Sequence, residues 1–233
     1  MSVHPDNFAA FYADKILQID YQLTHFCYLA AKPHFKGKNC LELGPSSGYM
    51  TKNLIQDFDR VVAVEGAADL VAKIPDAPNL EKVCSLFEEF STEEKFDTIV
   101  FNHVLEHIVD PIPLLKRILG WLSPGGHFIV GVPNARSFHR MVAVKMGLLD
   151  SIYTLNERDH QLGHQRVYDM DLLKEHLTGA GFSIAHETGV FLKFLANGQI
   201  EQWFSQDMIQ AFYELGKDYP ELCAEIMVVA TNK

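Results

Sequence analysis

One glycine-containing segment constrains the fold of this chain more than any other feature. Residues 41–51 read Leu-Glu-Leu-Gly-Pro-Ser-Ser-Gly-Tyr-Met-Thr, so that an apolar run passes through Gly44 and Gly48 into a helical pattern. A second apolar run at 61–64 ends in Glu65, 21 residues after Gly44. A strand, a turn with two glycines, a helix and a second strand ending in a carboxylate are typical of a unit that binds a nucleoside cofactor.

The remainder of the chain alternates between strand and helix patterns. Helical patterns occupy 49–58, 111–122 and 169–180. Short apolar runs predict five strands before residue 133, at 39–43, 60–64, 80–84, 98–101 and 127–132. Continuous Val, Ile and Leu in strands that alternate with helices predict a parallel sheet covered on both faces.

The regular alternation of strand and helix patterns ends after Pro133. Two further strands are predicted at 182–186 and 225–231, and the connection between them contains a helical pattern at 200–215. Because this connection lacks a regular crossover helix, we expect the last strand to be antiparallel. The sequence therefore predicts an α/β fold with a doubly wound, seven-stranded, mostly parallel sheet.

We expect the chain to consist of an N-terminal helical cap and a main domain that carries two inserts. Apolar residues spaced by three and four at 8–31 predict one or two helices, which form an N-terminal helical cap within 1–36. The main domain then covers 37–233, with one insert at 134–168 and a second at 190–222. Polar inserts of this length are often functional.

The composition restricts the partners and the compartment. With 233 residues and 48% hydrophobic residues, the chain has material for a large core, and its net charge of −10 opposes binding to nucleic acid. The four cysteines form no Cys-x-x-Cys pair, which fits a reducing cytoplasmic compartment. No signal peptide or membrane-spanning run is visible. A small-molecule substrate and a monomeric or homodimeric protein are expected.

The loop itself favours some cofactors over others. A dinucleotide site needs glycines where Ser46 and Tyr49 stand, and a phosphate-binding Walker loop needs Lys directly after Gly48. Glu42, two residues before Gly44, favours a cationic ligand and opposes an anionic one. A nicotinamide oxidoreductase is therefore the less favoured hypothesis.

Several segments together resemble one family. They are the loop with Glu42, Gly44 and Gly48, the acid Glu65, and residues 96–103, 104–111, 122–126 and 163–168 with the helix and strand that follow. In this order they resemble the class I S-adenosylmethionine-dependent methyltransferases, in their small-molecule branch, over residues 38–188. The resemblance implies a Rossmann-like methyltransferase fold, S-adenosyl-L-methionine as cofactor and S-adenosyl-L-homocysteine as product.

The resemblance also implies the cofactor-binding residues. Glu65 would accept hydrogen bonds from both ribose hydroxyls, because a carboxylate has two oxygens suited to a diol. Ser46 departs from the glycine that many members carry. The complete set expected to hold the cofactor is Tyr12, Tyr21, Glu42, Gly44, Pro45, Ser46, Gly48, Glu65, Gly66, Leu86, Phe87, Asn102 and His103.

We expect a histidine to act as the base that activates the methyl acceptor. We predict O-methylation of a small polar metabolite, such as a sugar derivative or a phosphorylated or carboxylate compound, with His103, His107 or His164 as the base. The expected substrate-binding residues are His160, His164, Arg166 and Tyr168. The alternatives are N-methylation of a small amine and a catalytically inactive S-adenosylmethionine-binding partner protein.

Residues 103–107 also match His-x-x-Glu-His, a zinc peptidase signature. That motif must lie on a helix, whereas here it begins at the end of a predicted strand. A metal held by His103, Glu106 and His107 is a second interpretation, and a pairing of Glu106 with His107 that fixes the loop is a third. We favour the third and expect no metal.

Overall fold

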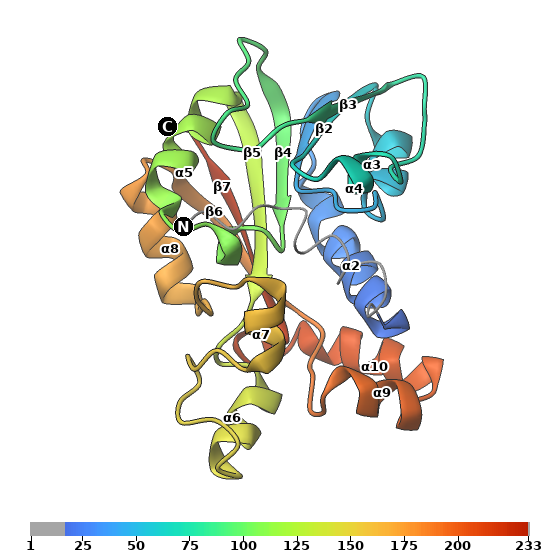
Figure 1. Ribbon diagram of the computed structural model, residues 1–233, viewed down its shortest axis with the longest axis vertical. Helices are drawn as coiled ribbons and strands as arrows, with labels where there is room; N and C mark the ends of the chain where they lie inside the picture. The colour runs from blue at the N-terminus through green and yellow to red at the C-terminus, as the bar shows by residue number, and fades with distance from the viewer. Residues whose placement is uncertain (1–16, 233) are drawn as a thin grey trace.

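The computed structural model describes residues 17–232, which form a single seven-stranded sheet with helices on both faces (Figure 1). The strand order is β3-β2-β1-β4-β5-β7-β6. The strands are β1 (Asn39–Leu43), β2 (Arg60–Glu65), β3 (Leu80–Cys84), β4 (Phe96–Asn102), β5 (Leu122–Pro133), β6 (Ser183–Val190) and β7 (Glu225–Thr231).

The pairing of the strands confirms the predicted fold class. β1 pairs in parallel with β2 and β4, and β3 and β5 continue the parallel sheet on either side. β7 is antiparallel to both β5 and β6. This strand order reverses at β1 and β4, which is where open α/β sheets place their ligands.

Alternate residues of the strands face two separate apolar layers. Leu41, Ile99 and Val130 pack in one layer, whereas Cys40 and Val100 pack in the other. The first layer is covered by α5 (Pro111–Trp121) and α8 (Met170–Gly179); the second is covered by α2 (Gln18–Ala31), α3 (Thr51–Asp57) and α10 (Gln206–Gly216). Successive strand residues are therefore buried on opposite faces of the sheet, as expected for a sheet covered by helices on both sides.

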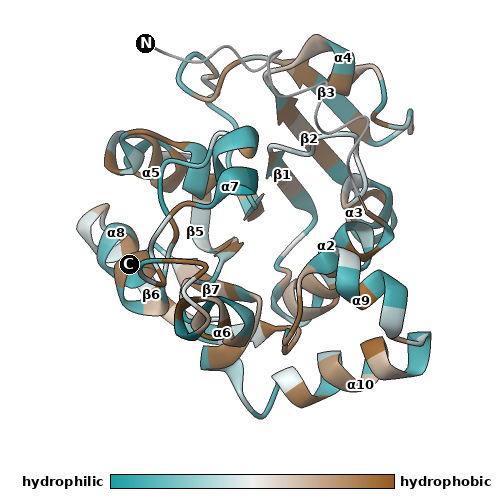
Figure 2. Ribbon diagram, turned by 60° about the horizontal axis from the view of Figure 1, so that its bottom comes forward, coloured by the Kyte–Doolittle hydropathy of each residue, from teal (hydrophilic) through white to brown (hydrophobic). Residues whose placement is uncertain are grey.

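The two inserts form the lower part of the molecule in Figure 1. Residues 134–168 contain α6 (Phe138–Lys145) and α7 (Glu157–Leu162), and the isolated bridge between Asn134 and Tyr168 closes the insert at its base. Residues 190–222 contain α9 (Asn197–Trp203) and α10. Figure 2 shows that α10 carries both hydrophilic and hydrophobic residues along its length.

Some predicted boundaries differ from the structure. The helix expected at 200–215 is two helices, α9 and α10, because Ser205 has extended backbone and its hydroxyl caps Met208 N at 3.3 Å. Strand β6 is longer than 182–186, because it continues pairing with β7 as far as Val190. The part of the 8–31 pattern before residue 17 lies outside the described residues. Across residues 17–232, no helix has the length and apolar character needed to cross a bilayer.

Candidate active site

A cavity of about 1330 Å³ opens at the carboxyl ends of the parallel strands. Its walls come from the loop after β1, the end of β2, the segments after β3 and β4, and both inserts. The volume exceeds the 300–1,000 Å³ typical of pockets for one small ligand. One cavity can therefore hold two small molecules side by side.

The glycine-containing loop adopts a conformation that side chains oppose. Gly44 has φ +75°, and a Cβ there would lie 2.4 Å from Val104 Cγ2. Gly48 has φ +79°, and a Cβ there would lie 2.7 Å from Pro75 Cδ. Gly44 lines the cavity, whereas Gly48 lies outside the lining and packs closely against Ile74 and Pro75. Ser46 itself has φ +51°, so the loop takes a glycine-like conformation at the position where the sequence departs from the family.

Glu65 ends β2 and faces this loop. Its side chain is buried; Oε2 accepts a hydrogen bond from Ser46 N at 3.0 Å and Oε1 accepts one from Ala67 N at 3.1 Å. Burial raises the pKa of Glu65, and the Ala67 and Ser46 N–H groups oppose that rise. Each oxygen keeps a second lone pair, so the carboxylate is fixed in place and can still accept from a diol.

Glu42 lies in β1 beneath the same loop. Thr51 Oγ1 donates to Glu42 Oε2 at 2.6 Å. Burial raises the pKa of Glu42 to about 7, with the Thr51 hydroxyl opposing the rise and the Glu65 charge adding to it. Glu42 is therefore about half ionised at pH 7, and its negative charge increases as the pH rises further.

The other residues predicted to hold the cofactor line the cavity, except for Tyr12, which lies outside the described residues. They include Tyr21, Pro45, Gly66, Leu86, Phe87 and Asn102. Tyr21 comes from α2 and packs on Tyr49 of the loop, with ring centroids 4.7 Å apart. Within residues 17–232, Asn102 Oδ1 is buried without a hydrogen-bond partner, and only a glycine fits beside it, because a Cβ at Gly131 would lie 2.3 Å from that atom.

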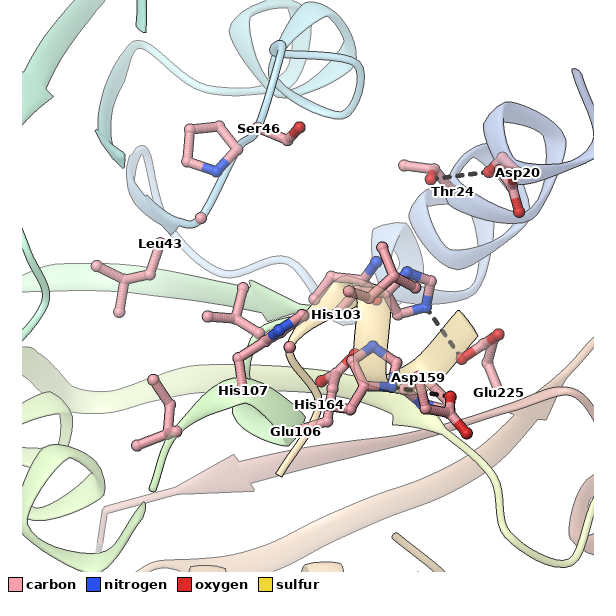
Figure 3. A pocket seen from close by; sticks show the side chains of 18 of the residues that line it. Asp20, Thr24, Leu43, Ser46, His103, Glu106, His107, Asp159, His164 and Glu225 are labelled. Atoms are coloured by element: carbon pink, nitrogen blue, oxygen red, sulfur yellow. Dashed lines mark hydrogen bonds and ion pairs between the residues drawn. The ribbon is translucent and has the colours of Figure 1, made fainter. Parts of the chain in front are cut away.

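His103 follows β4 directly and is the most constrained histidine of the site. Its backbone has φ +55°, which is rare and strained for a residue with a Cβ. Its Nε2 lies 3.0 Å from Glu225 Oε2, at the start of β7 (Figure 3). Burial, the largest single effect, would lower the pKa of His103, but the charge and hydrogen bond of Glu225 together with Cys27 raise it well above its ordinary value. Cys27 of α2 is fully buried nearby, and burial raises the pKa of its thiol while His103 opposes the rise.

A second group forms where α7 meets the segment after β4. His107 and His164 face each other with ring centroids 4.7 Å apart, and Glu106 lies beside them (Figure 3). His164 Nδ1 lies 3.1 Å from Asp159 Oδ1. Burial lowers the pKa of His107 to about 3, and the charges of His164 and His103 add to the effect, so this imidazole is neutral at pH 7.

Three residues predicted to bind substrate do not line this cavity. Arg166 donates to the carbonyls of Ile108 and Val109 and so ties down the segment after β4. Tyr168 is fully buried and its hydroxyl pairs with His176 Nδ1 at 3.0 Å. His160 is exposed on α7. Of the four predicted substrate residues, the structure brings only His164 to the cavity.

Three charged residues that were not predicted from the sequence also line the cavity. Lys193 follows β6, Arg158 lies in α7 and Asp20 lies in α2, and all three line the cavity. Arg158 Nη2 pairs with Asp20 Oδ2 at 2.9 Å. Burial lowers the pKa of Lys193 to about 8, with Glu225 and Asp20 opposing the shift. No motif marks these residues, because they meet only through the packing of both inserts and α2.

The fold and the residues around the cavity agree with a comparison to known protein families. The family model described as "Methyltransferase domain" matches residues 16–187. That match covers most of the chain, so the chain belongs to the methyltransferase domain family, and its fold is that of the class I S-adenosylmethionine-dependent enzymes.

One named relative and two solved structures are each less than 25% identical to this chain. Over 166 residues the chain is 24% identical to the ubiquinone biosynthesis O-methyltransferase of Rhodopseudomonas palustris, covering 69% of this chain and 64% of that relative's length. Among solved structures, a putative methyltransferase in complex with the Haloferax volcanii Trm112 methyltransferase activator has a TM-score of 0.69 at 18% identity, covering 97% of each chain. The N-methyltransferase NodS from Bradyrhizobium japonicum, in complex with S-adenosyl-L-homocysteine, has a TM-score of 0.59 at 15% identity, covering 94% of this chain and 89% of that one. These structures share the fold.

Proposed function

We propose that the protein transfers a methyl group from S-adenosyl-L-methionine to an oxygen of a small polar metabolite. The observation that carries this proposal is the pairing of His103 with Glu225 at 3.0 Å, beside Asn102 and at the end of β4, in the cavity that the cofactor loop also lines. The relative from Rhodopseudomonas palustris is an O-methyltransferase by name, which supports oxygen as the acceptor atom.

The residues present fit the cofactor. Gly44 lines the cavity with bare backbone, Glu65 is fixed with free lone pairs that a diol can use, and Glu42 favours a cation. When bound, S-adenosyl-L-methionine supplies a methyl group on a positively charged sulfur. Pro45, Ser46, Gly66, Leu86 and Phe87 would enclose it, and Tyr21 would cover it from α2. Gly48 would contribute by holding the turn.

The tasks of the chain at the acceptor end are orientation and proton removal. In its neutral form, His103 accepts the proton of the acceptor hydroxyl, and Glu225 holds the imidazole and stabilises the imidazolium that forms. Because the pKa of His103 is raised, the neutral form becomes more abundant as the pH rises. Alignment of the hydroxyl with the donor and exclusion of water by the inserts supply the rest of the rate enhancement. A base is needed because a neutral hydroxyl is a weak nucleophile at pH 7.

Lys193 selects the charge of the acceptor. Within residues 17–232 its ammonium group makes no ion pair, whereas Arg158 is engaged by Asp20. A desolvated ammonium group stabilises a phosphate or carboxylate. We therefore assign recognition of an anionic group to Lys193, in place of Arg166.

The proposal is tested with methyl-deuterated S-adenosyl-L-methionine and a cell metabolite extract. Mass spectrometry should find labelled methyl on a phosphorylated or carboxylated hydroxy compound, with release of S-adenosyl-L-homocysteine. A label found on amines alone would favour the N-methyltransferase alternative. Tight binding of the cofactor with no labelled product in any extract would instead favour a binding protein without turnover.

A further inference from the structure

We propose that Glu106, His107 and His164 bind one divalent transition-metal ion at the acceptor end of the cavity. One potential ligand atom from each residue lies within 4.8 Å of the other two. Ligands of one ion at bond lengths of about 2.0–2.2 Å lie roughly 3–4 Å apart, so a modest side-chain adjustment closes the site.

The carboxylate of Glu106 provides a second observation, independent of the clustering, that points to a bound cation. The side chain is 1% exposed, and its Oε2 has no hydrogen-bond partner among residues 17–232. A buried carboxylate oxygen without a partner is costly, and a cation removes that cost. The expected loop-fixing pair is absent from the described residues, where no hydrogen bond joins Glu106 to the imidazole of His107.

The support around His164 is the kind that metal-binding histidines have. Asp159 Oδ1 engages His164 Nδ1 at 3.1 Å, which leaves Nε2 for an ion. Asp159 is itself held by Arg140 at 3.2 Å and by Asn156 N at 2.9 Å. A carboxylate behind a ligating histidine fixes the tautomer and the orientation of the ring.

The structure also corrects the set of candidate ligands. His103 belongs to the pair with Glu225, so the sequence alternative of His103, Glu106 and His107 loses one member. His164 takes its place from 57 residues further along the chain than His107. The three donors comprise two imidazoles and one carboxylate, a set that suits Zn²⁺, Mn²⁺, Fe²⁺ or Co²⁺.

The role of the ion follows from its place. All three residues line the cavity, so an ion held by them has coordination positions open toward the acceptor. A bound ion would hold oxygens of the acceptor and lower the pKa of its hydroxyl. This role rests on the proposed methyl transfer, whereas binding of the ion does not.

The experiment uses tag-free full-length protein, stripped with EDTA and titrated with Co²⁺. We expect one equivalent by elemental analysis, with a visible absorption band from bound Co²⁺. Glu106→Gln, His107→Gln and His164→Gln should each weaken binding by at least tenfold. His160→Gln is the matched control, because His160 is exposed on the same helix region and outside the cavity, and it should bind like the parent.

Two results would overturn the metal site. One is an absence of the band in the parent protein at millimolar Co²⁺, and the other is parental affinity in the folded Glu106→Gln and His164→Gln variants. Calorimetry of S-adenosyl-L-methionine with the metal-free parent is read separately. Failure there removes the proposed function and leaves the metal result standing.

Discussion

The two ends of the cavity are built in different ways. At the end proposed to bind the cofactor, Glu42, Gly44 and Glu65 belong to one continuous strand-loop-helix-strand unit. At the end proposed to bind the acceptor, His103, Lys193 and Glu225 come from three segments that meet only in the folded chain. A local unit can be fixed by a few glycines and acids, whereas the acceptor end depends on the packing of both inserts against the sheet. Substitutions at the two ends should therefore change different measured quantities.

The largest expected effect is at the acceptor end. His103→Ala should lower kcat by roughly 10²–10⁴-fold, the range for loss of a general base. The affinity for S-adenosyl-L-methionine, measured by calorimetry, should change little, because the loop and Glu65 remain intact. His160→Ala serves as the control. An unchanged kcat would show that the acceptor arrives already ionised.

At the cofactor end, Glu42→Gln should make stability less dependent on pH. The folded-state pKa is about 7, above the ordinary 4.5, so the protonated acid is favoured on folding and stability is lost as the pH rises through 7. At about 1.36 kcal/mol per pKa unit the loss is roughly 3 kcal/mol. Urea unfolding without cofactor should show the variant about that much more stable at pH 8, and the difference should fall to below about 1 kcal/mol at pH 5.

The control for that measurement is Glu175→Gln, because Glu175 is exposed on α8. It should leave the pH dependence of unfolding as in the parent protein. Equal stability of Glu42→Gln and the parent at both pH values would mean that Glu42 is ionised at little cost in the fold. The negative charge under the loop would then be present at all pH values above 5.

A smaller effect is expected for Glu65→Ala. Loss of charged hydrogen bonds to the ribose should weaken S-adenosyl-L-methionine binding by on the order of 2 kcal/mol. Calorimetry gives the affinity, and circular dichroism checks the fold, because Glu65 also accepts from Ser46 and Ala67. Parental affinity in the folded variant would place the cofactor elsewhere.

The smallest effect is expected for Lys193→Met. The KM for an anionic acceptor should rise by about tenfold, which corresponds to about 1.4 kcal/mol, while kcat changes less. Lys116→Met is the control, because Lys116 is exposed on α5 and outside the cavity. An equal rise in KM for a neutral acceptor would assign Lys193 a packing role.

The fold could be predicted from the sequence because its signals are local. Short apolar runs indicated the strands, and the connection before 225–231 indicated an antiparallel last strand, as β7 shows. The single helix expected at 200–215 was wrong, because one serine cap outweighs a continuous helical pattern. Several predicted strands were too short, because pairing with a neighbouring strand extends them in the structure.

The residues that line the cavity could be predicted only in part: the loop residues and the three candidate base histidines were named from the sequence, whereas Glu225 and Lys193 were not. The loop residues lie along a short stretch of sequence, and the structure gathers them around one cavity. Arg166 and Tyr168 have the right chemistry for substrate, but their side chains are used inside the protein. Glu225 and Lys193 stand in ordinary apolar surroundings in the sequence, so nothing local distinguishes them. Only the course of the chain in space brings them to His103.

The direction of β7 has a further consequence. Because this strand is antiparallel, its first residue, Glu225, lies opposite Pro133 and Val190, at the edge where the parallel strands end. A nascent chain extended only to residue 220 already has the loop after β1 and His103, yet it lacks the carboxylate that holds the imidazole. Methyl transfer should therefore begin only after this part of the chain has left the ribosome and joined the sheet.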